Sequence, residues 1–501
     1  MKTYIDLIKS SQKIQWVLLL GLLVQIIFCI TSVGYFHPDQ HFQIIEFSSY
    51  QLNKPNAATA VWEFSSNIRP TIQVYIFSVF RLCCDFLKIN NAFHQLTILR
   101  LLQGLLFWVV FNLLAIYYCN KNNKQSLFIV LFIINFSWFL PYSRTIFSSE
   151  MVSALIFFPA ITFLYRQYIN NKLHFLTSIY IGFLLALSFY LRFQIAFAII
   201  GFGIWIILIE RQFKISLYLF LGFVIGILLN VFLDNHFYNK LVFTPYLYYK
   251  VNILQGVAAS FGEKSFTYYI GILIGIIGVP FISILLLYQY AKTSLQHIKH
   301  PIVLSTLFFI IGHFFVGHKE ERFMFTVINV IPIIIALNAN SFNFLKPDYR
   351  YIKLIKPVVI FSLGLNFLLL VLFIFNPYSQ TINFNKKISE YQPTQNSNIF
   401  CYTRTSLQTE SLLPLTYYKQ AFVNTNFINV NNIDSVAHLQ QKTIWLAATF
   451  NDLENNFNTI NTLGFKPVFY SSPMLWRINT FLASKKINTI NDIWVLYKLD
   501  K

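Results

Sequence analysis

Five consecutive titratable residues, His318-Lys319-Glu320-Glu321-Arg322, separate two runs that are otherwise almost wholly apolar. Charged side chains at the end of a membrane helix are costly to desolvate, so a dense cluster of both signs usually marks a site. His318, Lys319 and Arg322 could hold an anion such as a lipid phosphate. Two alternatives stay open. One is a metal site that uses His318, Glu320 and Glu321, although adjacent carboxylates do not easily share one ion. The other is a solvated, internally paired helix start.

A second polar cluster, His37-Pro38-Asp39-Gln40-His41, follows the first apolar segment. A carboxylate such as Asp39, close to the lipid headgroups and flanked by histidines, could deprotonate a hydroxyl as a general base. Asp39 also lies just past the end of an apolar segment, where an aspartate commonly serves as the N-cap residue of the next helix. The spacing of the residues leaves both roles open.

Aromatic and basic residues near other segment ends suit a sugar linked to an anion. In Trp62-Glu63, the indole could stack on the apolar face of a sugar ring while the carboxylate accepts hydrogen bonds from its hydroxyls. The tryptophan could equally anchor a helix at the membrane interface. Arg69 follows downstream, and Arg144 and Arg192 each interrupt an apolar context, which favours an anionic substrate.

The composition predicts the elements that must position these residues. The chain has 501 residues, of which 56% are hydrophobic and 11% charged, whereas soluble domains have about 25% charged residues. We therefore expect a polytopic membrane protein, whose net charge of +19 reflects basic cytoplasmic loops rather than nucleic-acid binding. The five cysteines offer no disulfide framework. About eleven segments are predicted to span the bilayer: 14–34 (uncleaved), 94–118, 126–142, 147–165, 173–190, 193–209, 215–233, 266–290, 301–317, 323–340 and 354–376.

The distribution of charge predicts the topology. Lys2, Lys9 and Lys13 keep the N-terminus inside. Segment 71–87 is predicted to lie on the outer leaflet as an amphipathic helix, because a further span would turn the later basic loops outward. The inner loops then hold Lys121, Lys124, Arg166, Lys172, Arg211, Lys214, Lys292, Lys299, Lys346, Arg350, Lys353 and Lys356, with the acids Asp6, Glu210 and Asp348. The outer face collects Asp39, Glu46, Glu63, Arg69, Arg144, Glu150, Arg192, Asp234, His236 and the cluster 318–322.

The C-terminal part of the chain, 378–501, is polar and rich in Asn, Thr and Ser, in contrast to the apolar part, 1–377. Alternating runs at Thr443–Leu446 and Asp492–Tyr497 predict strands, so we expect a small α/β extramembrane domain on the outer face. Because it is predicted to face the same compartment as the charged clusters, it could position an acceptor.

Four motifs resemble those of glycosyltransferase family 22, the mannosyltransferases that use dolichol-phosphate-mannose to build N-glycan precursors and glycosylphosphatidylinositol anchors. They occur in the family's order, and residues beyond about 340 lie outside the resemblance. The motifs are His37-Pro38-Asp39-Gln40-His41-Phe42-Gln43; Val61-Trp62-Glu63-Phe64 with Ile68-Arg69; the Ser143-Arg144-Thr145 turn with the loop Asp234-Asn235-His236-Phe237-Tyr238-Asn239; and His318-Lys319-Glu320-Glu321-Arg322-Phe323.

The resemblance implies an all-α membrane protein of the GT-C fold and an inverting transfer of mannose, or a related hexose. The donor would be a polyprenyl-phosphate sugar and the acceptor a lipid-linked glycan or glycolipid. Asp39 would be the base, and His318, Lys319, Arg322 and Arg192 would bind the donor phosphate, with no obligatory metal or other cofactor. The other expected substrate contacts are His37, Gln40, His41, Trp62, Glu63, Arg69, Arg144, Asp234, Glu320 and Glu321.

Two departures from the family pattern bear on acceptor choice: Gln40 replaces the usual acid, and Asn235 replaces the usual serine. The rival hypothesis is a transporter or flippase of lipid-linked sugars, which would place ionisable groups near mid-membrane, on broken helices and often in two-fold repeats. A structural subunit with a decayed site is disfavoured by the intact Asp39. Short termini without a retrieval signal favour a bacterial inner membrane, with the endoplasmic reticulum as the expectation for a eukaryotic chain.

Overall fold

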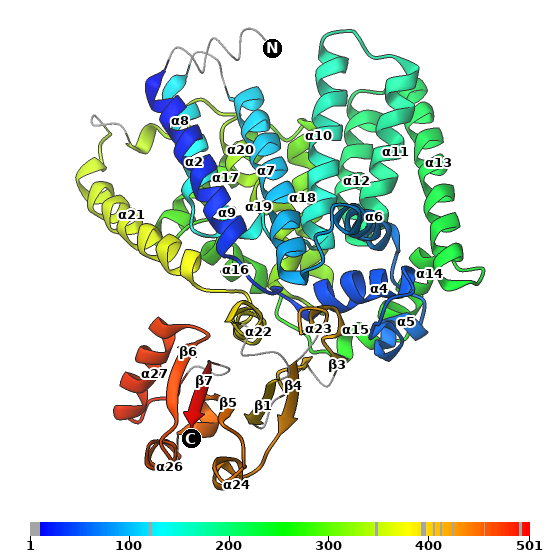
Figure 1. Cartoon of the computed structure of the whole chain (residues 1–501). Helices are drawn as coiled ribbons and strands as arrows, with labels where there is room; N and C mark the ends of the chain where they lie inside the picture. The colour runs from blue at the N-terminus through cyan, green and yellow to red at the C-terminus, as the bar shows by residue number, and fades with distance from the viewer. Residues whose placement is uncertain are drawn as a thin grey trace. The chain divides into compact units, whose positions relative to one another are not determined.

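The computed structural model describes residues 11–119, 123–345, 349–391, 397–403, 406–410, 413–422, 425–454, 456–489 and 493–501 (Figure 1). Six charged residues of the predicted topology and one residue of a predicted strand lie outside these ranges: Lys2, Asp6, Lys9, Lys121, Lys346, Asp348 and Asp492. Contacts divide the chain into two compact units. The first unit comprises Met1–Ile30, Glu63–Ile76 and Leu99–Phe375, and the second Thr31–Trp62, Phe77–Ile98 and Asn376–Lys501.

Apolar helices dominate the first unit. In the described part of the chain, five helices are long and apolar enough to cross a bilayer: α2 (Gln12–Thr31), α7 (Ala92–Tyr118), α10 (Ser149–Ile169), α13 (Phe213–Tyr238) and α21 (Ile352–Phe375). A pair bent by 113°, α16 (Tyr268–Ile276) and α17 (Pro280–Gln296), makes a sixth if it counts as one span. Shorter apolar helices are α8 (Lys124–Phe136), α11 (Phe175–Leu191), η3-α12-η4 (Phe193–Ile195, Ala196–Ile204, Trp205–Ile209) and α18 (Pro301–Phe315).

These helices confirm a helical membrane protein, and each of the eleven predicted segments contains helix. How many of them cross the bilayer stays a prediction. The predicted span 323–340 is not one continuous helix but three short pieces, η6 (Glu321–Met324), α19 (Phe325–Ile328) and α20 (Ile331–Ile335). Pro332 at the start of α20 has no N–H for the helical ladder, so the chain restarts there.

The closest helix packing occurs between α11 and α13. A Cβ added to Gly222 would lie 1.9 Å from the Ile179 carbonyl oxygen, and one added to Gly182 would lie 2.0 Å from the Leu219 carbonyl oxygen. Small residues four positions apart on each helix, Gly182 with Ala186 and Gly222 with Gly226, let the two backbones approach this closely. The remaining elements of the first unit are α9 (Phe139–Ser143), α14 (Thr244–Tyr249), η5 (Lys250–Leu254), α15 (Val257–Ser260) and η7 (Asn343–Leu345).

The second unit combines loop helices from the N-terminal part of the chain with the C-terminal segment. The helices are α3 (Pro38–Gln40), η1 (His41–Glu46), α4 (Phe47–Gln51), η2 (Ala58–Ala60), α5 (Trp62–Ser65) and α6 (Ile72–Phe86), the last two shared with the first unit. As predicted, α6 is amphipathic: Arg81 is fully buried, whereas Val79, Leu82 and Phe86 are exposed. Arg81 donates hydrogen bonds to Ser49 and to Gln420. The predicted interfacial position of α6 is a separate matter and stays a prediction.

The C-terminal segment forms a mixed five-stranded sheet in the order β4-β1-β5-β7-β6. The strands are β1 (Ser397–Tyr402), β4 (Thr425–Asn429), β5 (Thr443–Thr449), β6 (Lys466–Tyr470) and β7 (Trp494–Asp500); β2 (Thr409–Glu410) pairs with β3 (Leu413–Pro414). β1 pairs parallel with β4 and β5, and β7 runs antiparallel to β5 and β6. Apolar clusters on the sheet include residues of α22 (Gln380–Tyr391), α24 (Ile433–Ala437), α25 (Phe450–Leu453), α26 (Phe457–Thr462) and α27 (Pro473–Ser484). The short helix α23 (Thr416–Lys419) belongs to neither cluster. β5 contains the predicted strand Thr443–Leu446, and Trp494–Tyr497 of the second predicted strand lie in β7.

Candidate active site

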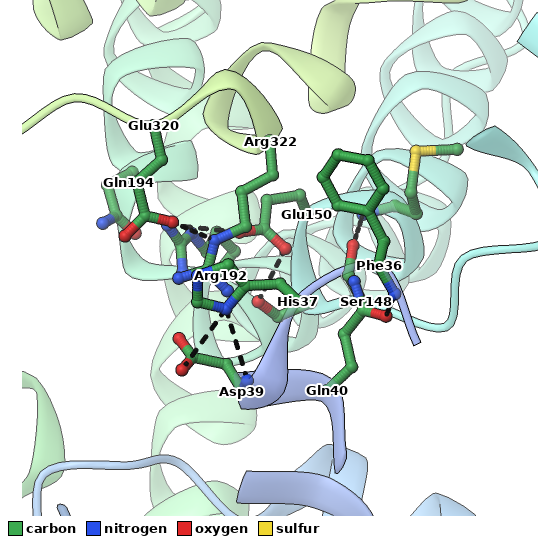
Figure 2. A network of polar contacts seen from close by, with 12 residues as sticks. Phe36, His37, Asp39, Gln40, Ser148, Glu150, Arg192, Gln194, Glu320 and Arg322 are labelled. Atoms are coloured by element: carbon green, nitrogen blue, oxygen red, sulfur yellow. Dashed lines mark hydrogen bonds and ion pairs between the residues drawn. The ribbon is translucent and has the colours of Figure 1, made fainter. Parts of the chain in front are cut away.

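A buried carboxylate, Glu150, is the centre of the charged cluster in the first unit. It lies in the first turn of α10, whose N-cap Ser148 accepts a hydrogen bond from the Met151 N–H. Glu150 is 1% exposed, and its Oε1 lies 3.3 Å from Arg192 Nη2 and 3.8 Å from Arg322 Nε (Figure 2). Two cations therefore share one buried carboxylate, an arrangement in which charges act strongly because water is excluded.

Arg192 lies at the end of α11, where the backbone is extended (φ −148°, ψ 107°) and turns its side chain away from the helix. Its guanidinium carbon lies 4.6 Å from the centroid of the Phe323 ring, and that of Arg322 lies 5.7 Å from the same ring. Arg192 Nη2 is buried and makes no hydrogen bond within the described residues, since the contact with Glu150 is an ion pair of poor hydrogen-bond geometry. A buried donor without an acceptor is unfavourable, so this group is suited to an anionic ligand.

The segment from His318 to Arg322 contributes further charges to this unit. His318 Nε2 lies 2.9 Å from Glu320 Oε1, and Arg322 also hydrogen-bonds Glu320. Lys319 is 4% exposed and donates to the carbonyls of Val316 and Lys264. The expectation of an internally paired segment is confirmed by these contacts, but its description as solvated is wrong for Lys319 and Arg322, which are buried. Glu321 differs again, because it accepts a hydrogen bond from the Tyr268 hydroxyl at 3.1 Å.

The metal alternative requires His318, Glu320 and Glu321 to converge on one ion. Glu320 instead pairs with His318 and Arg322, whereas Glu321 pairs with Tyr268. Across the described ranges, no three or more His, Cys, Asp or Glu side chains group so that they could hold a metal ion.

The buried carboxylate of Asp234, near the end of α13, is the centre of a hydrogen-bond network. Its Oδ1 accepts hydrogen bonds from the Thr71 backbone N–H (2.8 Å) and hydroxyl (2.7 Å), and its Oδ2 accepts one from the Thr244 hydroxyl (2.5 Å). Nearby, His236 Nδ1 lies 2.7 Å from the Tyr75 hydroxyl. The Asp234 carboxylate thus accepts three hydrogen bonds. These bonds hold the segment at Thr71 and the start of α14 against α13.

Glu63 and Arg69 form an ion pair with 3.3 Å between Oε1 and Nη2. Glu63 is 5% exposed, and the Tyr238 hydroxyl donates to the carbonyl of Arg69. The predicted contact of Glu63 with a sugar would have to form beside this ion pair. Trp62 belongs to the second unit and is 37% exposed, which leaves an aromatic face accessible.

Arg144 is fully buried and braces the membrane helices. Its Nε donates to Asn329 Oδ1 at 2.9 Å and its Nη2 to the carbonyl of Ile134 at 2.7 Å. Gln103 in turn donates to the carbonyls of Arg144 and Ile146, each at 2.8 Å. These bonds tie α8, α7 and the segment before α10 together, and none of them involves the acidic cluster around Glu150.

Asp39 lies in the second unit, in the first turn of α3 (Figure 2). The interpretation of Asp39 as an N-cap is wrong, because the N-cap is His37: its Nδ1 accepts the Asp39 backbone N–H at 3.3 Å. The Asp39 carboxylate is 22% exposed and lies 3.5 Å from His37 Nδ1. Gln40 is used locally, since its Oε1 accepts the Phe36 N–H at 3.1 Å. The capping role thus falls to His37, and the Asp39 carboxylate is left partly open to solvent.

His41, two residues after Asp39, is buried in an aromatic stack. Its ring stacks on Tyr35 and Tyr418 at centroid distances of 5.3 and 5.2 Å, and its Nε2 lies 3.0 Å from Glu46 Oε1. Glu46 also accepts the backbone N–H groups of Ala57 (3.0 Å) and Tyr417 (2.9 Å). The role of His41 in substrate binding stays a prediction. In the structure its contacts join the segment that carries Asp39 to the turn at Tyr417.

Residues 16–407 match the Alg9-like mannosyltransferase family. The chain belongs to this family. Among similar members, GPI mannosyltransferase 3 of Candida albicans is 26% identical over 65% of this chain and 64% of its own length. GPI mannosyltransferase 3 of Drosophila melanogaster is 24% identical over 62% of this chain and 54% of its own length. The chain thus spans just over half to just under two thirds of these relatives.

Solved structures show the fold that this family member adopts. One similar solved structure is the crystal structure of ArnT from Cupriavidus metallidurans bound to undecaprenyl phosphate. The superposition covers 97% of this chain and 97% of ArnT, with a TM-score of 0.56 and 10% sequence identity. ArnT in the apo state gives a TM-score of 0.53. This likeness confirms the expected GT-C fold class.

Two buried acids of this family member were not singled out from the sequence as site residues. Glu150 and Glu46 were both placed on the outer face, but only as members of the charge balance. For Glu150, the available signal was its position in the first turn of an apolar helix, two residues past a serine. For Glu46, the nearby His41 was the available signal, whereas its partner Tyr417 is 371 residues away in the chain.

Proposed function

We propose that the chain transfers mannose, or a closely related hexose, from a polyprenyl-phosphate donor to a lipid-linked glycan or glycolipid, with inversion at the anomeric carbon. Membership of the Alg9-like mannosyltransferase family supports the sugar and the reaction class. The observation that carries the proposal is the pairing of Arg192 and Arg322 with the buried Glu150, together with the buried Lys319 three residues before Arg322. Such a cluster suits a phosphate that gains charge as it leaves.

On the donor side, the three cations exceed the two nearest acids, Glu150 and Glu320, by one charge. A phosphate would therefore bind without leaving a large uncompensated charge in a buried site. Guanidinium groups suit phosphate because their planar donors match its oxygens in pairs. In this proposal, Glu150 keeps Arg192 and Arg322 oriented, and the open donor of Arg192 bonds a phosphate oxygen.

On the acceptor side, Asp39 removes the proton from a sugar hydroxyl. The hydroxyl oxygen forms a bond to the anomeric carbon, and the bond between that carbon and the phosphate oxygen breaks with its electron pair on the phosphate. Exposure of 22% lets the Asp39 carboxylate reach a substrate, and the aromatic face of Trp62 suits a sugar ring. His37, Gln40, Glu63, Arg69, Glu320 and Glu321 are further candidates for substrate contacts.

The proposed reaction takes place at the outer or lumenal face of about eleven spans. The membrane is the bacterial inner membrane, or that of the endoplasmic reticulum in a eukaryote, as the names of the relatives from Candida and Drosophila suggest. Residues 1–377 serve as the transferase domain, and residues 378–501 help to position the acceptor.

The test is transfer of radiolabelled mannose from polyprenyl-phosphate-mannose to host lipid extract by purified protein in detergent. Asp39→Asn is expected to lose about 10²-fold or more in kcat, the range for removal of a general base, with donor binding retained. Asp434→Asn makes the same chemical change at an exposed surface position and should retain full activity.

Full activity of Asp39→Asn would refute its role as the base. A chain that transfers no lipid-phosphate hexose, yet moves labelled lipid across reconstituted bilayers, would be a transporter, and the proposed reaction would then be wrong.

A further inference from the structure

The last apolar helix of the first unit, α21, stands away from its neighbours over much of its length. Only 11% of its most apolar 18-residue window is buried, against 50% for the corresponding window of α7. The helix is attached near its middle and end: Asn366 donates to the Phe136 carbonyl at 2.7 Å and accepts the Trp138 N–H at 3.0 Å, and the rings of Trp138 and Phe373 lie 4.5 Å apart. In the half that begins at Ile352, the ring of Phe361 lies 6.1 Å from that of Phe281 in α17.

Two hollows lie beside the middle of α21. The larger, of about 1060 Å³, lies between α2, α8 and α21 and is lined by Trp16, Leu20, Phe128, Phe132, Leu363 and Phe367, among others. The smaller, of about 310 Å³, lies between α8, α17 and α21. They lie next to each other, because Phe128, Phe132, Leu363 and Asn366 line both.

These hollows are open on one side, so the surrounding medium fills them. Atoms that line a hollow gain dispersion contacts from an occupant that matches their shape. Water is a poor occupant because most of the lining groups are apolar. In a bilayer, a lipid acyl chain fills such a space without any polar cost.

The lysines that line the hollows favour lipids with anionic headgroups. Lys13 and Lys124 line the larger hollow, and Lys353 and Lys356 line a third hollow of about 440 Å³ that shares Leu345 with the other two. All four lysines are exposed, and all were placed on the inner side of the membrane by the charge distribution. Basic hollows between membrane helices on the cytoplasmic side suit anionic headgroups.

We propose that the space between α2, α8 and α21 is a binding site for an anionic phospholipid of the inner leaflet. An acyl chain occupies the apolar space, and the phosphate lies among Lys13, Lys124, Lys353 and Lys356. The site is separate from the proposed donor phosphate cluster, whose cations belong to other elements. The bound lipid completes the packing of α21 against the bundle.

Native mass spectrometry of the purified full chain tests the site, with phosphatidylglycerol and phosphatidylcholine supplied in equal amounts. The wild type is expected to retain phosphatidylglycerol in preference. Lys13→Gln/Lys124→Gln should lower that preference by about 25-fold, since each lysine near an anionic headgroup contributes about fivefold. Lys172→Gln/Lys214→Gln removes the same charge from exposed inner positions away from the hollow and should leave the preference unchanged.

A second variant, Leu363→Trp, fills the apolar space and should lower retention of both phospholipids while the headgroup preference stays. Equal retention of the two phospholipids by the wild type would overturn the proposal. So would the displacement of phosphatidylglycerol by an equal amount of undecaprenyl phosphate, which would assign the space to a polyprenyl chain instead.

Discussion

At the scale of single residues, the buried charged groups differ in what surrounds their remaining hydrogen-bonding capacity. Asp234 accepts three hydrogen bonds from other elements and Arg144 donates two, so removal of either would chiefly loosen the fold. Arg144 Nη1 and Arg192 Nη2 are both buried donors without a hydrogen bond among the described residues, but only Arg192 belongs to the cluster around Glu150. Arg192 retains a buried donor that no described residue satisfies, beside a carboxylate that fixes its position. That difference makes Arg192 the sharpest test of the donor side.

Arg192→Gln should lower kcat/KM for the polyprenyl-phosphate sugar by about 10²-fold or more, because one preorganised donor to the developing phosphate charge is lost. Arg192→Lys should recover part of the loss, since the charge returns without the planar pair of donors. Initial rates against donor concentration measure both, with the exposed Arg166→Gln as the matched control. If only the thermal stability falls and kcat/KM per folded molecule stays constant, Arg192 acts solely in the ion pair with Glu150.

At the scale of elements, the fold depends on how closely helices approach. The contact between α11 and α13 has no room for a side chain at Gly222 or Gly182. Arg192 and Asp234 lie at or near the ends of these same two helices. Packing between α11 and α13 therefore sets the positions from which both residues act.

Gly222→Ala should destabilise the protein by about 1–3 kcal/mol, the usual cost of overpacking, because its Cβ would meet the Ile179 carbonyl oxygen. Gly203→Ala is the control: it is also helical, its Cβ would meet nothing within 4 Å, and it should be neutral or slightly stabilising. Thermal unfolding in detergent compares the two. Equal unfolding temperatures for Gly222→Ala and the wild type would show that α11 and α13 can separate without cost.

At the scale of the whole molecule, the second unit draws on three distant parts of the chain. Glu46 accepts backbone N–H groups at Ala57 and at Tyr417, and Tyr418 stacks on His41. The segment that carries Asp39 is thus held by contacts with the C-terminal segment. The C-terminal segment therefore supports the segment around Asp39 in addition to any contact with acceptor.

Truncation after Pro377 should consequently abolish transfer with every acceptor rather than only change acceptor preference. The truncated chain loses the partner of Glu46 at Tyr417 and the ring that stacks on His41. Hydrogen exchange should then show faster exchange in residues 41–51, while the helices α11 and α13 serve as an internal reference that stays protected. A truncated chain that keeps its rate with one acceptor and loses it with another would limit the C-terminal segment to acceptor choice.

The sequence by itself determined the class of protein, the main helices, the family and the location of the charged clusters along the chain. Long apolar runs and the motif at His37–Gln43 are local signals, which depend on residue type and spacing alone. Only the tertiary structure decided which charges pair. The sharing of Glu150 by Arg192 and Arg322, the engagement of Asp234 and Arg144, and the clamp of Glu46 on Tyr417 join residues far apart in the chain. Their pairing depends on distances and burial in three dimensions, which residue type and spacing do not specify.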